Sequence, residues 1–250
     1  MPEAEVQRTG LQHDRRWMLI DETGLFVSQR THTQLATLQV NLTEEGFMIS
    51  HKKDSIKPFF LSFNETTNTK IQVNIWDDQC IATEVSPSAN KWFSDVLQMR
   101  VRLVYMPETT QRLVEPDYAN NNEIVSFADA YPFMMIGQSS LDDLNNRLDK
   151  PVLMNRFRPN FVFSGGTPYI EDKMESFKIG DINFKGVRPC ARCVLTTINQ
   201  ENATKGSEPL KTLATYRTVK NKVMFGQNLL HSGEGIVRVG DKIEVIKLHD

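Results

Sequence analysis

The chain has 250 residues, 40% hydrophobic and 24% charged, which suits a globular protein with room for one large or two small hydrophobic cores. Its formal net charge of −2 gives no basic excess for nucleic acid or an anionic membrane surface, and no apolar run reaches the length of a membrane span. Three cysteines, an odd number, favour a reducing compartment, so we expect a cytoplasmic protein that binds neither nucleic acid nor membrane.

The first part of the sequence predicts mainly short β-strands. Apolar runs at 13–20 and 25–29 flank a Gly-containing turn at 21–24, a pattern typical of a β-hairpin. Further strands, separated by polar breaks, are expected at 3–6, 37–42, 47–50, 58–63 and 71–76. This succession of strands indicates a small barrel or sandwich.

A helix is expected to begin at Ser86 and Pro87, because serine caps a helix N-terminus and proline suits the first turn. Its apolar stripe consists of Trp92, Phe93, Val96 and Leu97. A buried strand is predicted at 101–105, and we place a soft boundary between two regions at 86–101. The polar residues 107–124, which include Asn120, Asn121 and Asn122, are expected to form a surface loop.

The remaining sequence mixes strands with helices. Strands are predicted at 133–136 and 160–163, and the turns at 179–181 and 239–241 are each expected to join two strands. Ser139 or Ser140 is expected to cap a helix, with Asp142 and Asp143 near its positive end. A further helix is predicted to start at 208–209, with the apolar residues Leu210, Leu213, Ala214 and Tyr216. The elements together predict a β-rich α+β fold.

Two of the three cysteines, Cys190 and Cys193, stand three residues apart beside Arg188 and Arg192. A cationic neighbour favours the thiolate, which is the form that attacks electrophiles and binds metals. Pro189 ahead of the pair and the β-branched run 194–198 behind it predict a tight loop that feeds a strand.

Four interpretations of this cysteine pair remain open. A zinc site needs two more ligands, and only Cys80 and five scattered histidines are left to supply them. A redox dithiol needs its first cysteine at a helix N-terminus, whereas 194–198 predicts a strand. The pair can also be two buried, inert thiols, or one thiolate that holds a soft metal or a sulfur atom.

Arginines elsewhere in the sequence favour the last interpretation. Arg15 and Arg16 precede one predicted strand, and Arg156 and Arg158 precede another. A guanidinium can bind phosphate or another planar anion through two parallel hydrogen bonds. Surface salt bridges are the alternative role for these side chains.

Four segments, in this order, resemble the MOSC family, which is named after the C-terminal domain of molybdenum cofactor sulfurases. They are 14–18 (Asp-Arg-Arg-Trp-Met), 155–160 (Asn-Arg-Phe-Arg-Pro-Asn), 192–197 (Arg-Cys-Val-Leu-Thr-Thr) and 225–228 (Phe-Gly-Gln-Asn). The likeness is greatest to the mitochondrial and bacterial branch that reduces amidoximes. It implies an N-terminal β-barrel-like region at 1–92, lacking its first strand, followed by a MOSC β-barrel domain with flanking helices at 93–250.

The resemblance also implies roles for single residues. It makes Cys193 the catalytic residue and the thiolate ligand of molybdenum, with molybdopterin supplying its own dithiolene sulfurs. Cys190 would be a neighbour of the site without being a ligand. Contacts with the cofactor are implied for Arg15, Asp129, Ala130, Tyr131, Arg158, Ala191, Arg192 and Asn228.

The implied activity is molybdenum-dependent reduction of a small N-hydroxylated substrate, with a separate ferredoxin, flavoprotein or cytochrome as electron donor. Neither an iron–sulfur cluster nor a pyridoxal-phosphate domain is expected in this chain, because an iron–sulfur domain of the kind some relatives carry needs four cysteines. Relatives have an earlier strand and a Lys-Ser pair that also hold the cofactor, and Met1 stands after that point. The expectation is therefore a truncated start or a less firmly held cofactor.

Two departures from the family pattern bear on the pocket. Asn199 and Gln200 stand where relatives often have Asp-Pro, and Asn228 replaces an aromatic residue. A rival interpretation is a non-catalytic carrier of molybdenum cofactor, or of sulfur as a persulfide on Cys193. A remnant that binds no cofactor is the third possibility.

Overall fold

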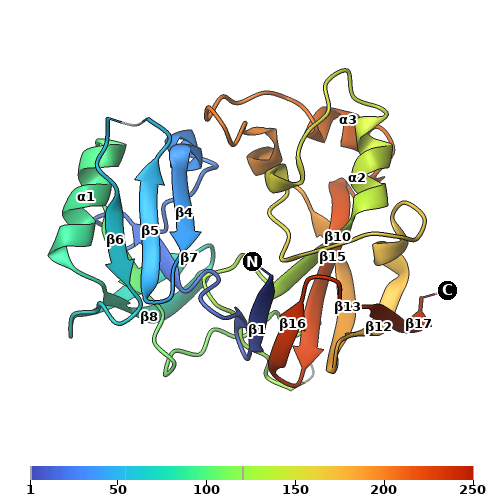
Figure 1. Cartoon of the computed structure of the whole chain (residues 1–250), viewed down its shortest axis with the longest axis horizontal. Helices are drawn as coiled ribbons and strands as arrows, with labels where there is room; N and C mark the ends of the chain where they lie inside the picture. Colours follow the sequence, from blue (N-terminus) through green and yellow to red (C-terminus); the bar gives the residue numbers. More distant parts are fainter. Residues whose placement is uncertain (1, 54, 120, 250) are drawn as a thin grey trace. The chain divides into compact units, whose positions relative to one another are not determined.

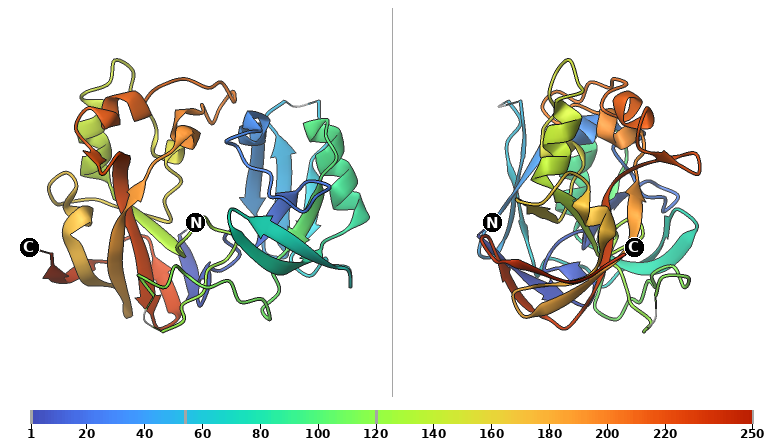
Figure 2. Two further views of the ribbon diagram at one scale, coloured as in Figure 1. Left: turned by 180° about the vertical axis from the view of Figure 1, so that it is seen from behind. Right: turned by 90° about the vertical axis from the view of Figure 1, so that its right-hand side faces the viewer.

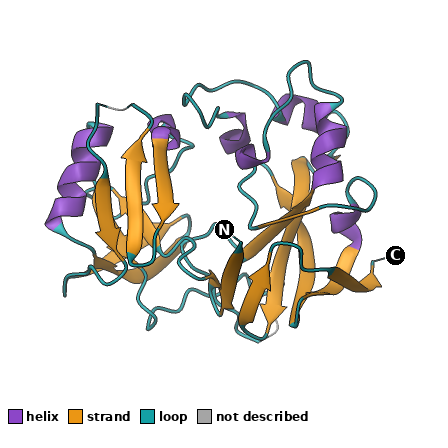
Figure 3. Cartoon of the chain, viewed as in Figure 1, coloured by secondary structure: helices purple, strands orange, loops and turns teal. Residues whose placement is uncertain are grey.

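The computed structural model describes residues 2–53, 55–119 and 121–249. Strands predominate over helices (Figures 1 and 3), which confirms the predicted β-rich α+β class. The chain divides into two compact units, and neither is a single stretch of sequence. Unit 1 comprises Met1–Asp14, Leu113–Thr197 and Ser207–Asp250, and unit 2 comprises Arg15–Arg112 and Ile198–Gly206. The division into regions at 92 and 93 stays a prediction.

Unit 2 contains two antiparallel sheets and a helix. The strands of the four-stranded sheet are, in spatial order, β3 (Trp17–Ile20), β9 (Arg102–Tyr105), β8 (Asp78–Glu84) and β7 (Lys70–Ile75). The strands of the three-stranded sheet are β4 (Leu38–Leu42), β5 (Gly46–His51) and β6 (Phe59–Ser62), and the short helix η1 (Thr33–Thr37) precedes them. Most of the predicted strands of this region are therefore confirmed.

Helix α1 (Pro87–Leu97) joins the two sheets of unit 2 through one core. The Ser86 hydroxyl accepts a hydrogen bond from the Ala89 N–H (3.2 Å), which is the predicted cap. Phe93 of the helix shares this core with Leu103 of β9 and Leu61 of β6. Among the described residues, no helix is both long enough and apolar enough to cross a membrane.

Two expectations for unit 2 are corrected. Residues 25–29 do not form the second strand of a hairpin, because Leu25 and Phe26 make only isolated bridges, to Asn74 and Ile20. Strand β8 was not predicted, since Asp77, Asp78 and Gln79 at its start are typical of a turn. Residues 107–124 are irregular, as expected of a loop, although Asn120 lies outside the described residues.

Unit 1 is built on a curled seven-stranded sheet (Figure 2). Its strands are, in order, β11 (Phe161–Phe163), β10 (Phe133–Gly137), β15 (Lys222–Ser232), β13 (Ile182–Ala191), β12 (Met174–Ile179) and β17 (Ile243–Leu248), with β14 (Thr218–Val219) paired to β15. A second sheet has the order β16 (Gly235–Arg238), β1 (Glu3–Gln7) and β2 (Gly10–Leu11). Phe133, Phe177 and Phe184 fill the core between these strands.

The helices of unit 1 are short: α2 (Gln138–Asn145), α3 (Leu210–Ala214) and the 3-10 turns η2 (Met154–Arg156), η3 (Ile170–Lys173) and η4 (Val194–Thr197). The predicted cap of α2 is wrong, because the helix begins after Gly137 and both serines lie inside it. Glu171, fully buried, performs the capping: its carboxylate accepts hydrogen bonds from the Gly137 N–H (3.1 Å) and the Ser140 hydroxyl (2.9 Å). Asp142 and Asp143 consequently lie in the second half of the helix.

Candidate functional site

The cysteine segment lies at the end of β13, where this strand leaves the sheet. Ala191 is the last residue of β13 and pairs with Met224 of β15. The backbone N–H of Arg192 adds one more hydrogen bond, to the Val223 carbonyl (2.7 Å). Cys193 is the next residue and is half-buried. The pairing with β15 therefore fixes the backbone on the N-terminal side of Cys193.

The residues after Cys193 form the 3-10 turn η4, so the strand predicted at 194–198 is wrong. The Cys193 carbonyl accepts hydrogen bonds from the backbone N–H (3.2 Å) and the hydroxyl (3.0 Å) of Thr196. The Thr197 hydroxyl donates in the same way to the Val194 carbonyl (2.7 Å). The β-branched residues suggested a strand, but their hydroxyls bond to carbonyls three residues earlier and stabilise a turn. Cys193 is thus held between a strand end and a turn.

Arg192 connects this segment to the residues that precede β11. Its Nη2 donates a hydrogen bond to the Phe157 carbonyl (2.7 Å), and its guanidinium lies 5.5 Å from the centre of the Phe157 ring. Its Nη1 donates to Sγ of Cys190 (3.1 Å) and to Sδ of Met134 (2.8 Å). Cys190 thus serves as a hydrogen-bond acceptor for Arg192. Both terminal nitrogens of the Arg192 guanidinium thus donate to groups of the protein, so they do not all face a ligand.

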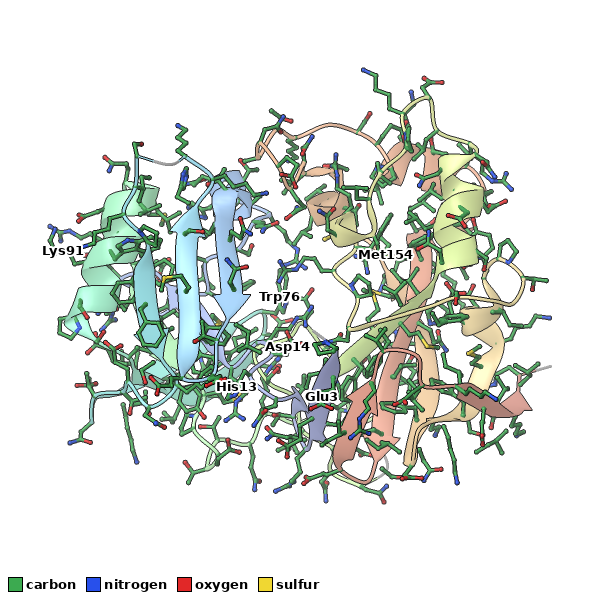
Figure 4. The ribbon with its side chains drawn as sticks, in the orientation of Figure 1. Glu3, His13, Asp14, Trp76, Lys91 and Met154 are labelled. Carbon is green, nitrogen blue, oxygen red and sulfur yellow. The ribbon has the colours of Figure 1, made fainter. Side chains whose placement is uncertain are left out.

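The segment bound by Arg192 places Arg158 at the surface. It begins with η2 at Met154, labelled in Figure 4, and the Phe157 ring packs on Phe225 with ring centres 4.4 Å apart. Arg158 follows with φ of 54° and an exposed side chain. Asn160 then binds β10: its N–H donates to the Met134 carbonyl (2.9 Å) and its Oδ1 accepts from the Met134 N–H (3.0 Å). Arg158 therefore lies between two anchored residues.

Asn228 occupies the centre of the seven-stranded sheet. It pairs with Met134 of β10 on one side and with Arg188 of β13 on the other. Residues directly opposite one another in an antiparallel ladder project to the same face. The side chains of these three residues therefore share the face on which the Arg192 guanidinium contacts Met134.

The segment before β10 contributes Tyr131, which is 7% exposed. Burial raises the pKa of Tyr131 to about 12, so its hydroxyl keeps its proton at neutral pH. This hydroxyl lies near the Arg188 guanidinium but outside hydrogen-bonding geometry. Asp129 is exposed and Ala130 half-buried just ahead of it.

The structure brings most of the predicted residues into one unit. Those in unit 1 are Asp129, Ala130, Tyr131, Arg158, Cys190, Ala191, Arg192, Cys193 and Asn228. Arg15 is the first residue of unit 2. Arg16, its neighbour, is buried and donates through Nη2 to the Met106 carbonyl (2.5 Å) and to Glu108 (2.7 Å), so it supports unit 2 from within.

One buried polar atom next to Cys193 has no partner within the described part of the chain, namely Nε of Arg192. Oε1 of Gln227 is also unpaired, but Gln227 stands opposite Met135, so its side chain projects to the other face of the sheet from Met134 and Arg192. Buried donors and acceptors normally have partners, because leaving one unpaired costs about 1–3 kcal/mol. A donor of this kind suits an acceptor on the polar edge of a heterocycle, and the Cys193 thiolate suits a soft metal.

Two residues that sequence reasoning missed organise this site. Met134 receives hydrogen bonds from both Arg192 and Asn160, and Phe157 supplies the carbonyl that holds Arg192. Phe157 stands inside one of the four motifs noted in the sequence. Met134 carried no signal, because an apolar residue in a strand is normally assigned to the core.

Comparisons with known proteins agree with this architecture. The MOSC domain model matches residues 122–244, and the model of the MOSC N-terminal beta barrel domain matches residues 1–100. Mitochondrial amidoxime-reducing component 1 of Mus musculus is 31% identical over 98% of this chain and 76% of its own length. The same-named protein of Danio rerio is 30% identical over 96% of this chain and 78% of its own length.

A second kind of relative is much longer than this chain. Molybdenum cofactor sulfurase of Arabidopsis thaliana is 32% identical over 88% of this chain, and the match covers 29% of the sulfurase. The fold and the cysteine segment define a protein of two strand-rich units with one thiol held at a strand end. With the two family models and these relatives, the chain belongs to the MOSC family.

Proposed function

We propose that this protein is a molybdenum-cofactor-dependent oxidoreductase that reduces small N-hydroxylated compounds, with Cys193 as the thiolate ligand of the metal. The observation that carries this proposal is the placement of Cys193 between the end of β13 and the turn η4, beside the Arg192–Phe157 contact and the unpaired buried Nε of Arg192. The similarity to amidoxime-reducing components supports the substrate class.

The residues of unit 1 suggest how the cofactor would be held. Cys193 would bind the metal, and the unpaired Nε of Arg192 would pair with the polar edge of the pterin. Arg158, exposed beside this segment, suits the phosphate group. Tyr131 keeps its proton at neutral pH and can therefore donate a hydrogen bond. Contacts from Arg15, Asp129, Ala130, Ala191 and Asn228 belong to the same proposal.

When bound, the cofactor would supply the two-electron chemistry that breaks the N–O bond. The overall reaction consumes two electrons and two protons, and it converts an N–OH group into N–H and water. The chain itself would orient the thiolate: β15 and η4 fix the Cys193 backbone, while Arg192 keeps the Phe157 segment against the strand. The two electrons would come from a separate protein.

The experiment that tests the proposal measures metal and activity together. Molybdenum is determined in wild type, Cys193→Ala and Cys190→Ala after expression in a host that makes the cofactor. Near-stoichiometric metal in wild type and Cys190→Ala, with loss in Cys193→Ala, is expected. Reduction of benzamidoxime and hydroxylaminopurine with a chemical reductant should follow the metal. Metal-loaded protein that leaves both compounds unchanged would refute the proposed activity.

The match with molybdenum cofactor sulfurase supports a second candidate, a carrier of cofactor or sulfur. In that case Cys193 would carry a persulfide and no substrate would be reduced. Intact-protein mass spectrometry distinguishes the two, because a persulfide adds one sulfur atom to wild type and none to Cys193→Ala.

A further inference from the structure

The hairpin that leads into β15 forms a basic surface close to the candidate site. Residues 218–222, named here the lysine hairpin, run from β14 through Lys220 and Asn221 to the start of β15. Val219 pairs with Lys222 across the hairpin, so these two side chains project to the same side. The hairpin extends from the rest of unit 1 (Figure 2, right).

The turn of this hairpin keeps the lysines outward. Lys220 and Asn221 have φ of 47° and 61°, which are the two left-handed positions of a two-residue hairpin turn. Asparagine tolerates this conformation, whereas lysine adopts it rarely and gains no packing here, because Lys220 is exposed. Val219 is 54% exposed beside them. Within the described part of the chain, neither Lys220 nor Lys222 forms an ion pair.

The charge of this region contrasts with the charge of the whole chain. Residues 207–223 contain four basic residues, Lys211, Arg217, Lys220 and Lys222, and one acidic residue, Glu208, while the whole chain carries a net charge of −2. Arg217 is neutralised by its ion pair with Asp172. The exposed Lys220 and Lys222 therefore give the hairpin a positive surface that can attract an acidic protein.

The register of the sheet places this surface near Cys193. Lys222 is followed by Val223, whose carbonyl binds the Arg192 N–H, and Cys193 is the residue after Arg192. One strand spacing and two steps along the chain give at most about 13 Å between the Cα atoms of Lys222 and Cys193. A protein docked on the hairpin would thus stand beside the proposed redox centre.

We propose that the lysine hairpin is the docking surface for an acidic one-electron carrier protein, a partner that the proposed function requires. Lys220 and Lys222 steer the carrier, and exposed Val219 gives the contact an apolar centre with a charged rim. This inference rests on the proposed reductase activity for its purpose. The binding itself can be measured without any turnover.

The test compares two double charge reversals with the same change in net charge. Lys220→Glu/Lys222→Glu alters the hairpin. The control, Lys185→Glu/Lys242→Glu, alters exposed lysines of unit 1 outside it, and Lys185 lies six residues before Ala191, about 20 Å along β13. Isothermal titration at low and high salt uses three acidic probes: a [2Fe–2S] ferredoxin, a flavodoxin and a soluble haem b domain.

At least one probe should bind wild type and the control alike, and bind the hairpin variant at least about tenfold more weakly, with the difference shrinking in high salt. The proposal would be overturned if both variants bound equally weakly, if binding did not depend on salt concentration, or if no probe bound at all. Loss of molybdenum from the hairpin variant would also overturn it, because the lysines would then serve the cofactor. Turnover with reduced methyl viologen should be equal in all three proteins. Absence of this turnover in wild type would count against the reductase and leave the docking result standing.

Discussion

Replacing Arg192 by methionine tests whether this side chain holds the Phe157 segment against the cysteine strand. The change removes the hydrogen bond from Nη2 to the Phe157 carbonyl, the contacts to two sulfur atoms and the interaction with the Phe157 ring. A hydrogen bond from a charged donor contributes about 1.5–3 kcal/mol, and a cation–π contact about 0.5–1 kcal/mol. Desolvation of the guanidinium, relieved in the variant, offsets part of this sum.

We therefore expect Arg192→Met to lower the free energy of unfolding by about 2 kcal/mol. Arg156→Met is the matched control, because Arg156 directly precedes Phe157 and, among the described residues, makes only a long contact of 3.5 Å with the Thr196 carbonyl. Its loss should cost less than about 1 kcal/mol. Urea denaturation followed by tryptophan fluorescence and far-UV circular dichroism gives both values.

A second measurement separates positioning from general stability. Native-state hydrogen exchange of 154–160 and the rate of Cys193 alkylation should both increase in Arg192→Met under conditions where the protein is fully folded. Both should stay at wild-type values in Arg156→Met. If Arg192→Met were no less stable than Arg156→Met, and exchange in 154–160 were unchanged, the assigned role of Arg192 would be wrong.

Three further predictions concern other residues of the structure. Burial raises the pKa of the Glu171 carboxyl, so the folded state holds this proton more tightly than the unfolded state. The protonated carboxyl therefore stabilises the fold fully at a pH below the pKa of an ordinary glutamate. This stabilisation is lost as the pH rises through the pKa of Glu171 in the folded state, by at most about 1.4 kcal/mol per pH unit. Urea midpoints measured from pH 4 upward should therefore fall more steeply in wild type than in Glu171→Gln, and parallel curves would contradict this. Tyr131→Phe should leave the free energy of unfolding of the metal-free protein within about 0.5 kcal/mol of wild type, because the hydroxyl makes no hydrogen bond among the described residues. The same change should reduce molybdenum retention severalfold in elemental analysis. Ser86→Ala should cost about 1 kcal/mol through loss of the α1 cap, read from the same denaturation curves, while Ser88→Ala, on the exposed first turn, should cost less.

The sequence allowed the elements with strong local signals to be predicted. Alternating apolar residues identified β7 and a short apolar run identified β5. Ser86 with Pro87 identified the start of α1, because a cap and a proline act within one turn. The α2 cap could not be found in this way. Glu171 lies 34 residues from Gly137, and only the tertiary fold brings its carboxylate to the helix.

The candidate site was predicted from motifs more than from physics. The chemistry of Cys193 and the arginines could be argued from residue type, but the contact between Arg192 and Phe157 could not, since it joins residues 35 apart in the sequence. The turn η4 was missed because strand propensity and hydroxyl-to-carbonyl bonding compete in the same residues. The grouping of nine predicted residues in unit 1 emerges only from the pairing of β10, β13 and β15.

The discontinuous division of the chain also has a consequence for biosynthesis. All of unit 2 except 198–206 is complete once residue 112 has left the ribosome, so its sheets can form early. Unit 1 must wait, because β1 pairs with β16 across more than 230 residues, with Glu3 opposite Arg238. Contacts of such large sequence separation form slowly. Strand β1 can pair early with β2 but lacks its other neighbour until β16 emerges, and the cysteine segment gains its β15 partner only after residues 222–232 have emerged.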